Sequence, residues 1–216
     1  MPHYFTVSTV SELVCLLVSF CLVNDRSLVW RSLILYMLIT CLAEFSGVYI
    51  ERTGSSNHWV YNILVIFDAG FMSLMFAHLF KRYEKSRFII VGLILFIALY
   101  TYQLTTQGLF EYDNLTFASM SVVYVVYCLY YYLLLIRDED YANIRYSPAF
   151  WWVTGAVFFY FGNTACNLFA YQFGDYKTYQ RLSYTIFKIL NVLQYGLWSY
   201  SFICKRWLIA KSNVSY

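Results

Sequence analysis

Three carboxylates stand inside apolar stretches of the sequence, where an ionised group has a high energetic cost. Glu44 lies in LITCLAEFSGVYIE, Asp68 lies in VIFDAGF, and Glu12 lies in the first apolar stretch. A charged side chain at the centre of a membrane helix costs about 2.5–3.5 kcal/mol on insertion scales. Because such residues mark ion pathways, proton relays or ligand sites, these three acids are the candidate functional groups.

The composition indicates that these acids lie in a membrane protein. Of the 216 residues, 61% are hydrophobic and 12% are charged, whereas soluble domains carry about 25% charged residues. About 20 apolar residues span a bilayer as a helix, and the chain contains seven such stretches, roughly 5–23, 28–50, 60–80, 88–105, 115–136, 150–172 and 184–204. The sequence therefore predicts an all-α, polytopic seven-transmembrane-helix bundle, with residues 1–216 as a single domain.

Lysine and arginine are distributed unevenly between the segments that connect these spans. One side carries Arg52, Lys177 and Arg181, while Lys188 lies inside the last span. The other side carries the remaining eleven: Arg26, Arg31, Lys81, Arg82, Lys85, Arg87, Arg137, Arg145, Lys205, Arg206 and Lys211. Because Lys and Arg concentrate in cytoplasmic loops, we expect the N-terminus outside and the C-terminus in the cytoplasm.

With this orientation the acids and several other polar residues fall at a similar depth. At 1.5 Å per residue, Glu12, Glu44 and Asp68 lie about 9–12 Å below the outer boundary. The sixth and seventh spans add polar residues whose spacing of three or four places them on shared helix faces: Asn163, Asn167, Lys188, Asn191 and Gln194. We expect these eight residues to line a ligand-binding polar cavity in the outer half of the bundle.

The charge of this cavity suits a cation, a proton or an amine-bearing ligand. Lys188 either pairs with one of the acids, which leaves a residual negative site, or extends to water along its flexible stem. A purely structural network is the alternative, because buried Asn and Gln contribute about 0.6 kcal/mol each as links between helices. The sequence leaves both interpretations open.

No catalytic or cofactor motif is present in the sequence. His58 is predicted outside and His78 near the inner end of the third span, so the two cannot share a metal ion. The six cysteines form neither a CxxC pair nor a Cys/His cluster. A Schiff-base role for Lys188 is disfavoured because this residue lies near the outer end of its span. We therefore predict no catalytic residue, no metal site and no cofactor.

Two segments carry a resemblance to a known family. Residues 57–82, NHWVYNILVIFDAGFMSLMFAHLFKR, resemble a YN-I-x-x-x-E third helix, and residues 147–169, SPAFWWVTGAVFFYFGNTACNLF, resemble a sixth helix with P-F-W followed by F-x-G-N. These patterns are similar to a poorly characterised family of small seven-helix inner-membrane proteins from Bacteroidota, in which Glu stands where this chain has Asp68.

The resemblance implies a bacterial inner (cytoplasmic) membrane location and a sensory role, and it implies no substrate or catalytic residue. By position it points to Asp68, Gly162 and Asn163, and it adds Tyr61, Asn62 and Trp151 as supporting residues of the site.

These observations favour a receptor-like or sensory membrane protein that binds a small cationic or amine-bearing ligand in the outer-half cavity. The alternatives are a small transporter or ion- or proton-conducting protein and, third, a membrane-embedded lipid-modifying enzyme. The enzyme is the least favoured because no nucleophile or metal set is visible. The expected partners are the lipid bilayer, a separate cytoplasmic or membrane signalling protein and further copies of the chain, and nucleic acid is not among them.

The predicted topology can be tested with reporter fusions. A reporter placed after Tyr216 should be active in the cytoplasm, and one inserted in the 106–114 loop should be active outside the membrane. An external reporter after Tyr216 would invert the topology and every depth estimate above.

Overall fold

The computed structural model describes residues 6–111, 113–138, 144–169 and 176–214, apart from the side chains of 114, 167–169, 176–180 and 212–214. Within these residues the regular elements are seven α-helices and two short 3₁₀ helices, which confirms the predicted all-α fold. The chain divides into two compact units, Met1–Met120 and Ser121–Tyr216. The expected single seven-helix domain stays a prediction.

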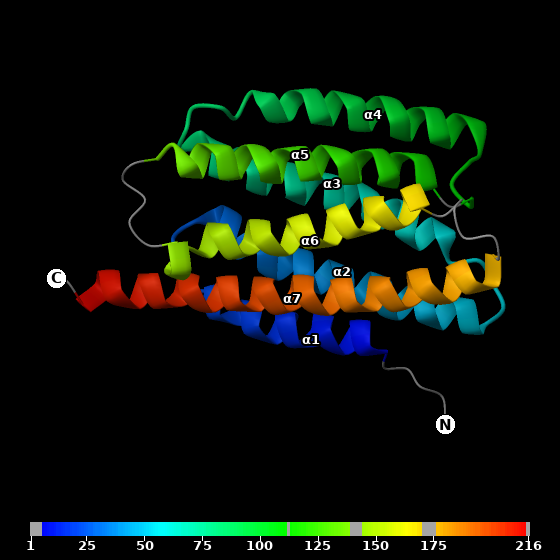
Figure 1. Ribbon diagram of the computed structural model, residues 1–216. Helices are drawn as coiled ribbons and strands as arrows, with labels where there is room; N and C mark the ends of the chain where they lie inside the picture. Colours follow the sequence, from blue (N-terminus) through cyan, green and yellow to red (C-terminus); the bar gives the residue numbers. More distant parts are fainter. Residues whose placement is uncertain (1–5, 112, 139–143, 170–175, 215–216) are drawn as a thin grey trace. The chain divides into compact units, whose positions relative to one another are not determined.

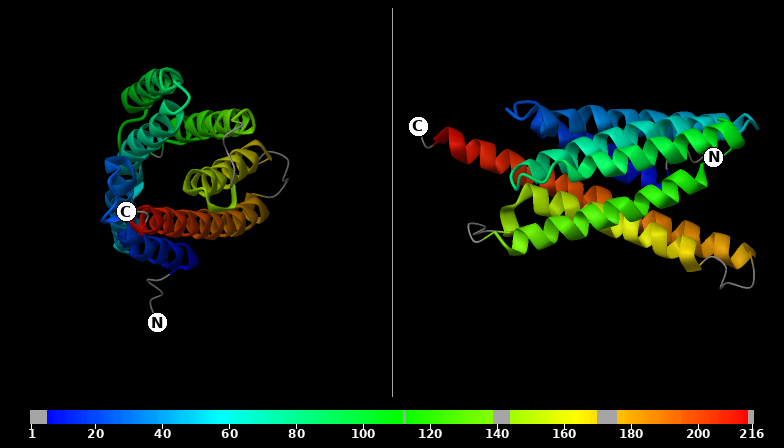
Figure 2. Two further views of the ribbon diagram at one scale, coloured as in Figure 1. Left: turned by 90° about the vertical axis from the view of Figure 1, so that its left-hand side faces the viewer. Right: turned by 90° about the horizontal axis from the view of Figure 1, so that it is seen from above.

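The first unit is a row of helices in chain order. It contains α1 (Val7–Ser19) continued by η1 (Phe20–Leu22), α2 (Leu28–Arg52), α3 (His58–Lys81), α4 (Phe88–Thr106) and the first turns of α5 (Asn114–Ile136). Helix α1 packs on α2, α2 on α3, and α3 on α4. Figure 1 and the left view of Figure 2 show these four helices following one another from blue to green.

Local sequence signals explain where these helices begin and end. The Thr6 side chain accepts a hydrogen bond from the Thr9 backbone N–H at 3.2 Å, and the Thr9 hydroxyl accepts one from the Thr6 N–H at 2.8 Å. This reciprocal capping box satisfies two otherwise unpaired donors at the start of α1. After α2 the chain turns through Gly54, whose φ of 79° is readily adopted only by glycine.

Helix α1 and η1 together form a shorter apolar helix, Val7–Leu22, and α1 packs through a regular buried stripe. Thr9, Glu12, Leu16 and Ser19 are all buried and recur every three or four residues, so they form one face of the helix. Cys15 on the same face lies 4.0 Å, sulfur to sulfur, from Met37 of α2. The stripe is therefore the surface that α1 presents to α2.

The second unit consists of most of α5, η2 (Ile144–Tyr146), α6 (Pro148–Phe169) and α7 (Tyr176–Val214). Helices α6 and α7 lie side by side in both figures. Side chains also join α5 to α6: the Tyr132 and Thr154 hydroxyls are 2.9 Å apart, and the rings of Tyr124 and Tyr160 lie 4.8 Å apart.

A buried tryptophan pair fixes the approach of α6 to α7. The rings of Trp152 and Trp198 stack at 5.5 Å, and the Trp198 indole N–H donates to the Trp152 carbonyl at 3.0 Å. Both side chains are almost completely buried. Gly155 makes room for this contact, since a Cβ atom there would lie 2.7 Å from the Trp198 ring. A small residue thus lets two membrane helices approach closely.

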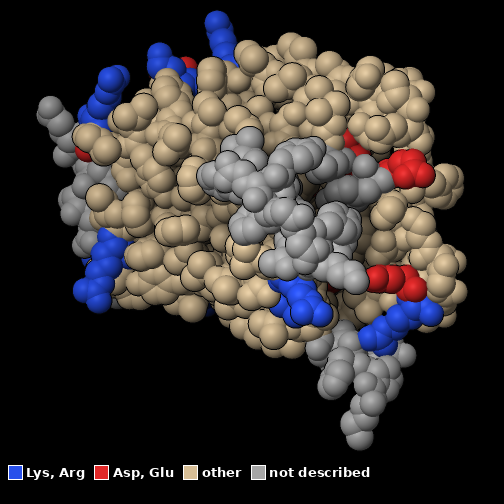
Figure 3. Space-filling model, turned by 45° about the vertical axis from the view of Figure 1, so that its right-hand side comes forward, with Lys and Arg blue, Asp and Glu red and all other residues tan. Residues whose placement is uncertain are grey.

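Four described helices are long and apolar enough to cross a membrane: α2, α3, α4 and Leu115–Ile136 of α5. They identify the chain as an integral membrane protein. Figure 3 shows one face on which residues other than Lys, Arg, Asp and Glu cover most of the surface. Each of the seven predicted spans overlaps one α-helix, although the spans 5–23 and 150–172 include residues outside the described ones. The count of seven membrane crossings stays a prediction, because α1 is short and polar residues interrupt α6 and α7.

The tryptophan pair predicts a specific loss of stability. Trp198→Phe removes the indole N–H and leaves the buried Trp152 carbonyl without that bond, which should lower the free energy of unfolding by about 1–3 kcal/mol. Trp207→Phe is the matched control, because Trp207 is 48% exposed. Denaturation in detergent micelles should separate the two variants, and equal stability would show that the indole bond contributes nothing.

Candidate functional site

Two of the three predicted acids lie in one cluster on α1, α2 and α3. The Tyr61 hydroxyl of α3 donates to Glu44 Oε2 of α2 at 3.2 Å. Glu12 of α1 and Cys41 of α2 are buried, and the Cys15–Met37 contact between α1 and α2 places Glu12 near the level of Cys41. We call Glu12, Cys41, Glu44 and Tyr61 the carboxylate cluster.

The cluster depends on a close approach of Tyr61 to α2. Cys41, Glu44 and Gly47 recur every third residue and so lie on one face of that helix. A Cβ atom on Gly47 would lie 2.6 Å from the Tyr61 hydroxyl oxygen and 2.9 Å from the ring. Only glycine therefore leaves room for the phenol to lie against α2 and reach Glu44.

The third acid has a different tyrosine partner. The Tyr36 hydroxyl of α2 donates to Asp68 Oδ1 of α3 at 2.8 Å. Tyr36 is 7% exposed, and its ring lies 5.0 Å from that of Phe71. A tyrosine hydroxyl is neutral at ordinary pH, so the bonds to Glu44 and Asp68 orient these carboxylates without cancelling a negative charge.

Three contacts between α2 and α3 agree on one antiparallel register: Asn57 with Gly47 at 3.2 Å, Tyr61 with Glu44, and Asp68 with Tyr36. In this register Asp68 lies level with Tyr36, eight residues before Glu44 in α2. Eight residues of helix correspond to about 12 Å. The expectation that Glu44 and Asp68 share one depth is therefore wrong.

The error came from counting each depth from its own span boundary. The limits of the predicted spans, Ile50 and Val60, do not lie level with each other, because the Asn57 amide reaches the Gly47 carbonyl. The start of α3 thus lies beside the interior of α2 instead of beside its end. Helix boundaries read from hydropathy do not define how two helices slide past each other.

Glu12 of α1 lies at a level between those of the other two acids, measured along the axis of α2. Its neighbour on the same face, Cys15, contacts Met37, so the antiparallel α1 places Glu12 near the level of Thr40. This level is four residues, or about 6 Å, from each of Glu44 and Tyr36. Glu44, Glu12 and Asp68 therefore form a staggered series, which we call the acid file, over about 12 Å.

The predicted polar residues of α7 belong to the second unit. Lys188 is half-buried, and its ammonium lies 3.9 Å from the ring centroid of Tyr184, a cation–π contact. Asn191 is buried and donates to the Phe187 carbonyl of its own helix at 2.9 Å. Gln194 is also buried. An approach of Lys188 to any acid of the first unit stays a prediction.

The predicted residues of α6 lie at two levels. Asn163 is buried, and its amide donates to the Ser121 hydroxyl of α5 at 3.4 Å. The side chain of Asn167 lies outside the described residues. Trp151 precedes Asn163 by twelve residues, or about 18 Å of helix, and its indole N–H donates to the Arg145 carbonyl at 2.8 Å. Trp151 thus anchors the segment before α6, far from the level of Asn163.

Asn62 holds a loop in place. Its amide N–H₂ donates to the carbonyls of Leu109 and Glu111, both at 2.7 Å, and its oxygen accepts from the Asp113 N–H at 3.1 Å. Because these bonds use both amide hydrogens, Asn62 fixes the connection between α4 and α5 instead of presenting donors to a ligand.

Sequence reasoning missed the role of Asp113 in this arrangement. Its carboxylate accepts from the Thr116 N–H at 2.9 Å and so caps α5. The segment DNLT offers this N-cap signal, because Asp stands three residues before Thr116 at the start of an apolar run.

Among the residues that the structure describes, no group of three or more His, Cys, Asp and Glu side chains could hold a metal ion. Comparison of the chain with known protein families, curated proteins and solved structures finds no match. The chemistry of the site therefore comes from its own geometry: carboxylates at successive levels, two of them held by tyrosine hydroxyls.

The contact at Gly47 can be tested by adding one methyl group. Gly47→Ala should displace Tyr61 from Glu44 and destabilise the protein by about 1–3 kcal/mol, the usual cost of overpacking. Gly70→Ala in α3 is the matched control, because a Cβ there meets nothing within 4 Å. Thermal unfolding in detergent should rank the control at or above wild type. If Gly47→Ala unfolds at the same temperature as the control, the close approach is not required.

Proposed function

We propose that this chain is a receptor-like membrane protein that binds a small cationic or amine-bearing ligand at the carboxylate cluster. In this proposal the chain crosses a bacterial inner membrane seven times, with its N-terminus outside, and acts through a separate signalling partner. The convergence of two buried or half-buried carboxylates and one tyrosine, from α1, α2 and α3, carries the proposal. Such a site offers charge, a hydrogen-bond partner and an aromatic face to an ammonium group.

The exposure of the cluster residues supports access for a ligand. Glu44 and Tyr61 are half-buried, so part of each side chain is accessible, while Glu12 and Cys41 are buried. Glu44 precedes the end of α2 at Arg52 by eight residues, or about 12 Å. With the predicted topology this end of α2 faces outward, so the ligand would enter from outside. A contribution of Asn163, Asn167, Lys188, Asn191 and Gln194 to the same cavity is part of the proposal.

The acid file supports a second candidate, a small transporter or a proton- or cation-conducting protein. Steps of about 6 Å between Glu44, Glu12 and Asp68 resemble a series of stations along α2 more than a single binding layer. Intramembrane carboxylates serve as proton relays in pumps and transporters. In this candidate the tyrosine hydroxyls of Tyr61 and Tyr36 orient the first and last station.

Neutralising the acids should separate these functions from a structural role. Glu44→Gln and Asp68→Asn keep the shape of each side chain and an oxygen that accepts the tyrosine bond, so the fold should remain stable or gain stability. We expect millimolar propylammonium, with propanol as the neutral control, to raise the unfolding temperature of wild type by about 4 °C at ten times the dissociation constant. Glu44→Gln should weaken this binding at least about tenfold.

Glu111→Gln is the control for these variants, because Glu111 is an exposed acid of the same unit. Proton flux into liposomes tests the second candidate with the same proteins. Flux through wild type that is lost in both Glu44→Gln and Asp68→Asn would favour conduction over reception. If both variants bind propylammonium with wild-type affinity and show wild-type proton flux, the acids have a structural role alone.

A further inference from the structure

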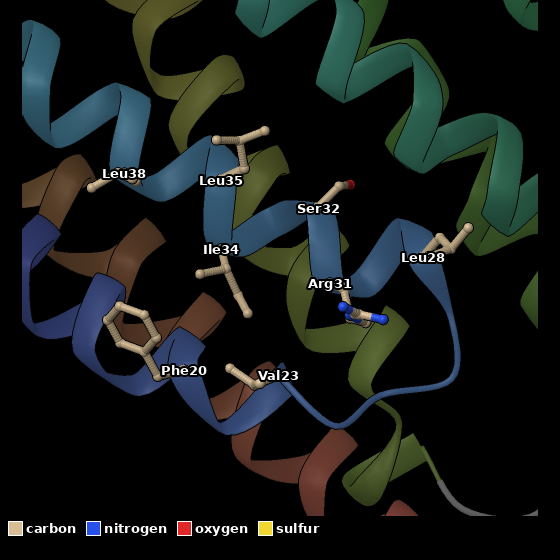
Figure 4. Close-up of a pocket in the computed structure, with 8 residues that line it drawn as sticks. All are labelled: Phe20, Val23, Leu28, Arg31, Ser32, Ile34, Leu35 and Leu38. Carbon is tan, nitrogen blue, oxygen red and sulfur yellow. The ribbon is translucent and has the colours of Figure 1, made fainter.

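An apolar groove lies at the opposite end of α2 from the carboxylate cluster. It has a volume of about 430 Å³ and is open to the surface, with walls from η1, from Val23 directly after η1 and from the first three turns of α2. Its lining residues are labelled in Figure 4: Phe20, Val23, Leu28, Arg31, Ser32, Ile34, Leu35 and Leu38. In that view Ile34 points toward Phe20 and Val23, so the groove separates α2 from the segment that precedes it.

The groove is apolar apart from one end. Phe20, Val23, Leu35 and Leu38 are each between 42% and 53% exposed, as expected for side chains that face lipid. Arg31 is exposed, and its guanidinium makes no ion pair or hydrogen bond with any residue that the structure describes. The Ser32 hydroxyl already donates to the Val29 carbonyl at 2.8 Å. Arg31 is therefore the group that would recognise a charged ligand.

The order of these residues along α2 matches the depth profile of a membrane leaflet. Arg31 lies in the first turn of the helix, and Leu38 follows it by seven residues, or about 10 Å. This length is about a third of the hydrocarbon core of a bilayer. One end of the groove thus offers a cation at the level of the headgroups, and the remainder offers apolar walls at the level of the acyl chains.

We propose that this groove binds one anionic phospholipid. The phosphate accepts hydrogen bonds from the Arg31 guanidinium, which matches phosphate oxygens with two parallel donors. One acyl chain lies between α2 and the Phe20–Val23 segment. No acid lines the groove, so the charge complementarity favours an anionic headgroup over a zwitterionic one. With the predicted topology the lipid belongs to the cytoplasmic leaflet.

Native mass spectrometry of the whole protein released from mixed phosphatidylglycerol and phosphatidylcholine nanodiscs tests this site. Wild type should retain phosphatidylglycerol in preference to phosphatidylcholine. Arg31→Gln should reduce that preference about fivefold, the effect of one basic residue at a membrane surface, and Arg31→Lys should restore much of it. Arg87→Gln, an exposed cation at the start of α4 outside the groove, should leave the preference unchanged.

The acyl-chain half of the site has its own variant. Leu35→Trp fills the groove and should reduce the retention of both lipids about tenfold, the loss of roughly two buried methylene groups. Leu42→Trp is the control, because Leu42 is exposed on α2 to a similar extent, 58% against 53% for Leu35, but lies beyond the groove. Variants are compared only where circular dichroism and unfolding temperature match wild type.

Several outcomes would overturn the proposal. If Arg87→Gln lost the preference for phosphatidylglycerol as much as Arg31→Gln, the lipid would be held by general electrostatic attraction to the basic surface and not by this groove. Binding of inorganic phosphate as tight as that of phosphatidylglycerol would mean an anion site without an acyl chain. A lipid-free dimer that dissociates in Leu35→Trp would assign the groove to a second copy of the chain. The groove and the carboxylate cluster share no residue. The lipid measurement therefore gives the same result whether or not the protein binds an amine at Glu44.

Discussion

A carboxylate inside a membrane helix needs a hydrogen-bond donor, because no bulk water is available to solvate it. In the first unit this constraint is met by tyrosine: Tyr61 donates to Glu44, and Tyr36 donates to Asp68. The two bonds run in opposite directions between α2 and α3, since each helix provides one acid and one phenol. Together they fix the register of the two helices, which places Asp68 about eight residues of helix away from Glu44.

Helix α2 is the element that the other parts of the first unit share. One face carries Cys41, Glu44 and Gly47 toward its neighbours, and its first turns carry Arg31 and the wall of the apolar groove. The two ends of the helix thus differ in chemistry, with acids toward one end and a free-standing cation at the other. In the second unit the polar side chains of Asn191 and Asn163 bond within the unit, and the stacked rings of Trp152 and Trp198 join α6 to α7.

The stagger of the acids changes what the site can do. Carboxylates at one depth would repel each other strongly and would hold one ligand or share one proton. Carboxylates about 6 Å apart along the helix repel each other less and can act one after another. In the proposed conducting function, Glu44 and Tyr61 form the accessible entrance, and Asp68 with Tyr36 forms the last of the three stations. The two proposed functions therefore differ in one respect. In a receptor the ligand stays bound at the carboxylate cluster, whereas in a conducting protein the proton or cation moves on past Glu12.

The sequence by itself determined the helices and showed which charged residues lie within them. Runs of about 20 apolar residues leave the helix as the only way to satisfy the backbone, and Glu12, Glu44 and Asp68 are conspicuous because they are costly there. The partners of these acids were decided only by the tertiary structure. Tyrosine is so frequent in this chain, with 23 residues, that neither Tyr36 nor Tyr61 could be recognised as the partner of an acid. Hydropathy could not place Asp68 opposite Tyr36 either. It measures the transfer of residues into lipid and carries no information about the register between two apolar helices. That register is fixed by the contacts of Tyr61 with Glu44, Tyr36 with Asp68 and Asn57 with Gly47.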